Sequence, residues 1–322
     1  MRLYQLLASS LLALSLSVNA TLAADWPTRA VHIIVPYPAG GGADTIARDM
    51  GDFLARKWKQ PVVIENKGGA SGSIGAAMVA KAEPDGYTLL INQAGPTTVF
   101  LTRKNPPYHP GRDFTNIILL GRVPTVLSVP ASSPYKTLAE LIAAAKADPG
   151  KLNFGSPGLA TPGDLAAEMF QAETGVRLQR IPFSGSSGVM TSLLGGQVQM
   201  SFDTVSANAE LIRSGQTRAF IVASNTRSAV LPDIPTGTEA GLKGWESYAW
   251  YGVAGPANLP KAIVAKINED LTEYLNSPRG RQRMDDLGML ASRGGTPEEF
   301  SAFILSELTR LAPVVKAAGL AE

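Results

Sequence analysis

Short apolar runs alternate with longer amphipathic segments along most of the chain after residue 26. The runs are rich in β-branched residues and end in turn-forming residues, a pattern typical of βαβ units and a parallel sheet. It predicts strands at 31–35, 62–64, 88–92, 117–129 (interrupted at Pro124), 152–154, 178–181, 198–202 and 218–223. It predicts helices at about 44–58, 74–82, 137–147, 162–173, 188–194 and 203–213. The fold class is therefore α/β, with two α/β units side by side.

Two helix starts carry stronger local signals. The stretch TLAE at 137–140 has a capping box, in which Thr137 and Glu140 satisfy each other's backbone N–H groups, and DPG at 148–150 ends that helix. TPEEF at 296–300 places Thr at the N-cap, Pro at the first helical position and acids in the first turn. Residues 260–318 are mostly helical in this pattern.

The first two dozen residues differ from the rest of the chain. Arg2 precedes an apolar run from Leu6 to Val18, and small residues follow. This pattern is typical of a cleavable secretory signal peptide, with cleavage after Ala20 or Ala23. The alternative, a membrane anchor, requires about 20 apolar residues, more than the run contains. We therefore expect residues 1–23 to be a signal peptide and the mature protein to be exported.

The first strand ends in the stretch VPYPAGGGAD at 35–44, where glycines lead into a helix. A helix N-terminus has unpaired N–H groups and a partial positive charge, so this turn suits a phosphate or carboxylate. It matches neither nucleotide fingerprint, because Thr45 stands where G-x-G-x-x-G needs glycine and no Gly-Lys-Ser/Thr follows. A merely tight turn is the alternative.

Similar turns follow other predicted strands, and in an α/β sheet they would face one cleft. They are GGASGSIG at 68–75, QAGPTT at 93–98, GSPGLATPGD at 155–164, PFSGSSG at 182–188 and FDTVS at 202–206. Each also has a structural interpretation: Asp44, Asp164 and Asp203 are possible N-caps, and Ser156 and Ser184 are possible turn residues.

Composition excludes several function classes. Lys and Arg number 29 against 27 Asp and Glu, and no basic cluster occurs, so we expect no nucleic-acid partner. The chain has two histidines and no cysteine, which excludes a His/Cys metal site and a disulfide and makes a Ser-His-Asp triad improbable. Among enzymes, the alternative function is that of a secreted α/β hydrolase, but the G-x-S-x-G motif of that class is missing from the sequence.

Several stretches resemble the Bug-type substrate-binding proteins of tripartite tricarboxylate transporters, in the order of that family and over the whole chain from Trp26. They are VPYPAGGGAD, GGASGSIGAAMVAKAEPDGYTLL at 68–90, KLNFGSPG at 151–158, LLGGQVQMSFD at 193–203 and RSAVLPDIPTGTEAGL at 227–242. The resemblance implies a two-lobed periplasmic binding protein, type II-like, with its ligand cleft between the lobes. It also implies a monomer without cofactor or metal that delivers a small organic acid to a membrane permease. A sensor that acts on a membrane signalling partner is the alternative.

The resemblance also implies lobe boundaries and ligand contacts. The first lobe would comprise 24–125 and 226–322, and the second 126–225. In the family the loop from Ala39 to Asp44 binds the ligand carboxylate through main-chain N–H groups and bridging water. The ligand-binding residues expected here are Tyr37, Ala39, Gly40, Gly41, Gly42, Asp44, Gln93, Ser156, Gly158, Thr161, Asp164, Phe183 and Asp203. Asp164 stands where many members have His, and residues 184–187 replace a lysine-containing turn, so the ligand preference of typical members does not transfer.

Overall fold

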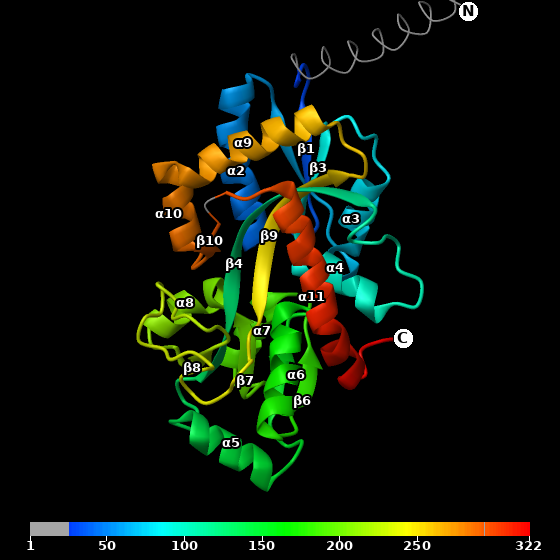
Figure 1. The fold of residues 1–322 in the computed structure, drawn as a ribbon. Coiled ribbons are helices and arrows are strands. Elements are labelled where there is room, and N and C mark those ends of the chain that lie inside the picture. The colour runs from blue at the N-terminus through cyan, green and yellow to red at the C-terminus, as the bar shows by residue number, and fades with distance from the viewer. Residues whose placement is uncertain (1–25, 293) are drawn as a thin grey trace, which may run out of the picture.

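The computed structural model describes residues 26–292 and 294–322 (Figure 1). The expected signal peptide lies outside these residues. The elements form two lobes, each built around its own part of a mixed sheet, and the predicted α/β fold is confirmed.

The first lobe contains the glycine-rich turn and a mixed sheet. Its strands, in spatial order, are β2 (Val62–Asn66), β1 (Val31–Val35), β3 (Thr88–Gln93), β9 (Tyr248–Pro256) and β4 (Phe114–Pro130), with the short β10 (Leu290–Ala291) beside β4. The first three strands are parallel, and β9 runs antiparallel to β3 and to β4. Pro260–Ala318 is mostly helical, as predicted, but the sequence pattern did not identify β9.

Side-chain alternation along β1 explains why helices cover both faces of this sheet. Val31, Ile33 and Val35 are fully buried in a core with α2 (Gly42–Trp58) and α9 (Lys261–Asn276). Ile34 points to the opposite face and packs with α3 (Ser73–Ala80). Also in this lobe are η1 (Ala70–Gly72), α4 (Ala94–Thr102) and α10 (Pro278–Asp286).

The second lobe repeats the arrangement around the other half of β4. Its strands are β8 (Thr217–Val222), β4, β7 (Met200–Thr204), β5 (Asn153–Ser156) and β6 (Gln179–Pro182), of which β7, β5 and β6 are parallel. Its helices are α5 (Leu138–Ala147), α6 (Pro162–Thr174), α7 (Ser186–Leu194) and α8 (Val205–Arg213). The capping box of Thr137 and Glu140 at the start of α5 is confirmed.

Strand β4 belongs to both lobes and runs without a break through Pro124, so the predicted interruption is wrong. Pro124 forms the last pair with β9, opposite Tyr248, and Thr125 forms the first pair with β7, opposite Thr204. Proline has no N–H to donate, and it is tolerated here because the strand changes partners at this point.

Helix α11 (Pro297–Ala317) lies along both lobes, and its capping box at Thr296 and Glu299 is confirmed (Figure 1). Phe300, near its start, packs on Trp250 of β9. Val315, near its end, packs with Leu165 of α6 in the second lobe.

The position of Trp245 indicates where the chain returns from the second lobe to the first. It packs with Phe170 and Phe202 in the second-lobe core, beyond the boundary expected near residue 225. We propose that the return to the first lobe occurs at the start of β9.

Candidate functional site

Helices follow six parallel strands at the carboxyl edges of the two sheets. They are α2, α3 (preceded by η1) and α4 in the first lobe and α6, α7 and α8 in the second. The two edges face each other, because Thr98 Oγ1 of α4 donates a 2.8 Å hydrogen bond to the carbonyl of Ala160, and Ser71 Oγ donates to the carbonyl of Leu159 at 3.4 Å. Positive helix ends therefore converge on the junction between the lobes, which favours an anionic ligand.

The glycine-rich turn presents bare backbone at this junction. Gly40 has φ of +87°, which only glycine adopts readily, whereas Gly41 is extended and is the N-cap of α2 without any side-chain cap. Gly40 and Gly41 are exposed. Among the described residues nothing accepts a hydrogen bond from the N–H groups of Gly41, Gly42 or Ala43. These three donors can bind an anion.

Asp44 holds this turn in shape. Its carboxylate, 4% exposed, accepts hydrogen bonds from the N–H of Gly40 at 3.0 Å, from Asn66 Nδ2 at 3.0 Å and from Arg48 Nε at 2.9 Å. Burial raises the pKa of Asp44, but these hydrogen bonds outweigh burial and leave the pKa below its ordinary value. The charge of the Asp44 carboxylate is therefore satisfied by groups of the protein itself, which favours a structural role for Asp44.

Tyr251 lies against the glycine turn and was not predicted, because its strand β9 was not recognised. A Cβ placed on Gly42 would stand 3.1 Å from the Tyr251 hydroxyl. Tyr251 also pairs in register with Gln93 of β3, so the two side chains lie on one face of the sheet. The signal in the sequence is the aromatic run YAWYG at 248–252, which is typical of a strand.

Gln93 and Tyr37 occupy the same edge of the first lobe. The Gln93 side chain is buried, and its Nε2 has no hydrogen-bond partner within the described part of the chain. The Tyr37 hydroxyl donates to the carbonyl of Ser71 at 3.2 Å, next to the contact with Leu159. The structure therefore places Tyr37 close to the second lobe and Gln93 at the carboxyl end of β3.

The second-lobe turn at 156–161 is held by its own hydroxyls. Thr161 Oγ1 donates to the carbonyl of Gly158 at 2.8 Å, and Ser156 Oγ donates to the same carbonyl at 3.2 Å. This turn faces the first lobe through Leu159 and Ala160. Phe183 packs instead on Gly188, where an added Cβ would stand 3.3 Å from the Phe183 ring. The ring also packs against the buried side chains of α7. This ring helps to position the start of α7.

Asp164 is fully buried at the start of α6. Its Oδ2 accepts from the N–H of Ala160 at 2.9 Å, and its Oδ1 lies 2.8 Å from Arg180 Nε, an ion pair within the second lobe. Burial raises the pKa of Asp164, and Arg180 opposes that rise. These contacts favour a structural role over contact with a ligand.

Asp203, at the end of β7, is 2% exposed and differs from Asp164 in having no cationic partner among the described residues. Its Oδ1 accepts from the N–H of Thr204 at 2.7 Å, whereas its Oδ2 has no hydrogen-bond partner in that part of the chain. Burial raises the pKa of Asp203 to about 6, although Thr204 and Ser186 oppose the rise. Burial, followed by the negative charge of Asp203, raises the pKa of Tyr251 to about 12.

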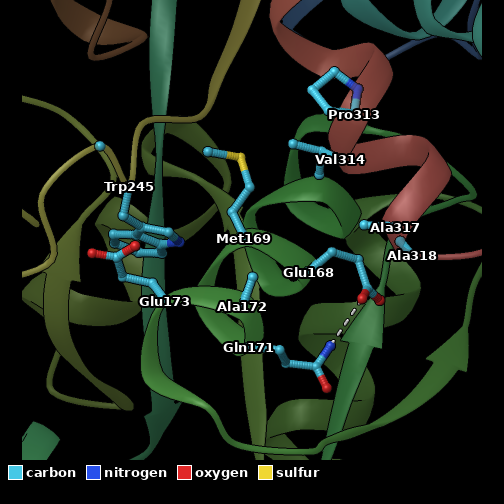
Figure 2. Close-up of a pocket in the computed structure, with 11 residues that line it drawn as sticks. Glu168, Met169, Gln171, Ala172, Glu173, Trp245, Pro313, Val314, Ala317 and Ala318 are labelled. Atoms are coloured by element: carbon cyan, nitrogen blue, oxygen red, sulfur yellow. Dashed lines mark hydrogen bonds between the residues drawn. The ribbon is translucent and has the colours of Figure 1, made fainter.

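A surface groove of about 490 Å³ lies elsewhere, between α6 and α11 (Figure 2). Met169 and Trp245 line it opposite Pro313 and Val314. Because it adjoins the second half of α6, it is separate from the start of that helix and from the strand ends.

Two further observations concern the described residues as a whole. They contain no group of three or more His, Asp or Glu side chains placed to hold a metal ion. No helix among them has the length and apolar character needed to cross a membrane.

Comparison with known proteins gives a consistent result. The profile of the tripartite tricarboxylate transporter family receptors matches residues 46–320. Protein BugT of Bordetella pertussis is 34% identical over 305 residues, covering 94% of this chain and 93% of BugT. The structure of Rpa4515 of R. palustris with adipate is 34% identical with a TM-score of 0.85, covering 91% of this chain and 98% of Rpa4515. The periplasmic binding protein BugD is 34% identical with a TM-score of 0.84, covering 92% of this chain and 99% of BugD. The resemblance to Bug-type proteins and the two-lobed fold are thereby confirmed.

Proposed function

Because the chain belongs to the tripartite tricarboxylate transporter receptor family, we propose that it binds a small carboxylate between its lobes and delivers it to a membrane permease of that transporter class. It acts as a receptor, by binding and release, without covalent chemistry.

The three N–H groups of Gly41, Gly42 and Ala43 carry this proposal. They are adjacent, they belong to the first turn of a 17-residue helix, and no described residue accepts from them. A carboxylate has two oxygens with lone pairs that suit such donors, and the helix end stabilises its charge. The proposed contact does not use Arg48, because its guanidinium is already bound to Asp44.

The opposite lobe supplies the second half of the site. The turn at 156–161 and the start of α7 follow parallel strands, as the glycine turn does. A ligand that touches both lobes stabilises the closed arrangement in proportion to its preference for that arrangement. The adipate bound to Rpa4515, which shares the fold over 91% of this chain, supports a small carboxylate as the ligand.

The cellular compartment of the mature protein follows from the proposed role as a receptor. A receptor that delivers its ligand to a permease works outside the inner membrane, and the charged start and apolar run of residues 1–23 fit export to the periplasm. We propose that the mature protein is free in that compartment.

A thermal-shift measurement tests the binding function. Mono-, di- and tricarboxylates are added singly to the purified protein, with the neutral diamide adipamide as the matched control for adipate. At 100 times its dissociation constant a carboxylate should add about 2.7 kcal/mol to the unfolding free energy, and adipamide should add none. An equal response to the acid and its amide, or no response to any acid, contradicts the proposal.

A further inference from the structure

Two buried polar atoms of opposite character lack partners at the proposed site. Gln93 Nε2 is a donor on the first lobe, and Asp203 Oδ2 is an acceptor on the second. Gln93 is 9% exposed and Asp203 is 2% exposed, so bulk water does not satisfy either group. A buried polar group without a hydrogen bond is costly, and a buried carboxylate without a cation is more so.

Tyr251 connects these two atoms to the glycine turn. It pairs in register with Gln93, and its hydroxyl lies close to Gly42 and is influenced by Asp203. The donor without a partner stands at the carboxyl end of β3 and the acceptor without a partner at the carboxyl end of β7, the edges that carry the proposed site. Asp44 and Asp164 differ from Asp203 because the carboxylate of each lies within ion-pair distance of an arginine.

This inference rests on the proposed carboxylate-binding function and narrows the class of ligand. We propose that the ligand carries, beside the carboxylate bound by the glycine turn, a hydrogen-bond donor that Asp203 Oδ2 accepts. An ammonium or a hydroxyl group has this chemistry. An unsubstituted diacid does not, because it would place a second carboxylate against the Asp203 carboxylate without a proton between them.

Titration calorimetry at pH 7.5 tests the inference with matched ligands. At each chain length three acids differ only in the group on C2: succinate, malate and aspartate; glutarate, 2-hydroxyglutarate and glutamate; adipate, 2-hydroxyadipate and 2-aminoadipate. At the length that fits, the hydroxy or amino acid should bind the wild-type protein at least ~10-fold more tightly than the unsubstituted diacid.

Variants assign the preference to one residue. Asp203→Asn should abolish a preference for the amino acid, because the charge is lost, and Asp203→Ala should abolish a preference for either substituent. Asp270→Asn changes another buried carboxylate, one that Trp58 and Lys57 bind in the first lobe, and should leave the order of ligands unchanged. The wild-type ranking needs no variant, so it remains decisive if a variant fails to fold.

The outcomes separate this inference from the proposed function. If diacids bind as tightly as their substituted analogues, the inference is wrong and carboxylate binding stands. A preference that survives in Asp203→Ala also overturns it, because another residue then accepts from the ligand. If no acid of any length binds, the proposed function fails and the inference fails with it.

Discussion

The guanidinium of Arg48 is bound to the carboxylate of Asp44, one turn earlier on α2, with Nε 2.9 Å from Oδ2. The only cation in the first turns of this helix is therefore directed at its own chain, and the proposed anion site before it relies on main-chain N–H groups.

Replacing Arg48 should consequently have little effect on the ligand. The side chain is 53% exposed, and ion pairs of exposed side chains contribute little because water screens them. Arg48→Ala should keep the carboxylate dissociation constant within about threefold of wild type. Calorimetry measures it, and loss of binding in a folded variant would show that the arginine, and not the backbone, holds the ligand.

Asp203 should give the ligand-free protein a characteristic pH dependence. Its pKa is raised from 3.8 to about 6 in the folded state, so between these values the folded chain keeps a proton that the unfolded chain has lost. The contribution of Asp203 to the unfolding free energy should therefore fall as pH rises from 4 to 6, by at most about 3 kcal/mol, and level off above pH 6.

Denaturation of wild type and Asp203→Asn at pH 4 to 7 measures this effect. The groups that act on Asp203 are Thr204, Ser186 and Tyr251, and none of them titrates in that window. The variant should gain stability relative to wild type with rising pH. A constant difference would mean that Asp203 has an ordinary pKa.

The Tyr251 hydroxyl should bind the ligand. No hydrogen bond from this hydroxyl to another described residue is present, while the ring packs in the first-lobe core. Tyr251→Phe should weaken carboxylate binding by ~10-fold to ~100-fold, since a hydrogen bond to a charged group contributes about 1.5–3 kcal/mol, and should leave the ligand-free melting temperature unchanged. Unchanged affinity would place the hydroxyl outside the site.

The ion pair of Asp164 and Arg180 should contribute to the unfolding free energy and should have no effect on which carboxylate binds most tightly. Arg180→Ala leaves a fully buried carboxylate without its cation and should cost about 3 kcal/mol of unfolding free energy. The ranking of carboxylates by affinity should be that of wild type. A changed ranking together with a small loss of stability would return Asp164 to the ligand site.

Local patterns in the sequence were sufficient for most of the fold. The alternation of strands and helices and both capping boxes depend on neighbouring residues, and the structure confirms them. Strand β9 was missed and β4 was predicted as interrupted, because both are set by long-range pairing. Tyr248 pairs with Pro124 across more than a hundred residues, and nothing local to either residue indicates that contact.

For the candidate site, the sequence indicated the glycine turn but not the different roles of the three aspartates at the strand ends. Asp44, Asp164 and Asp203 all follow strands and precede or open helices, so their sequence contexts are alike. Their partners distinguish them: Arg48 comes from the next turn of the same helix, whereas Arg180 comes from another strand. Asp203 has neither, and only the folded structure reveals that difference.

The most direct test of the main-chain anion site is calorimetry of Gly41→Val with the tightest carboxylate found for wild type. Gly41 has φ of −81°, and a Cβ there would meet nothing nearer than the Pro38 carbonyl oxygen at 4.0 Å, so valine fits the ligand-free turn. The account predicts a ligand-free melting temperature lowered by a few degrees at most, because valine is a poorer N-cap residue than glycine. It predicts binding weakened by at least ~10-fold, because the branched side chain fills the space in front of the N–H groups. A folded Gly41→Val that binds the carboxylate as tightly as wild type would contradict it.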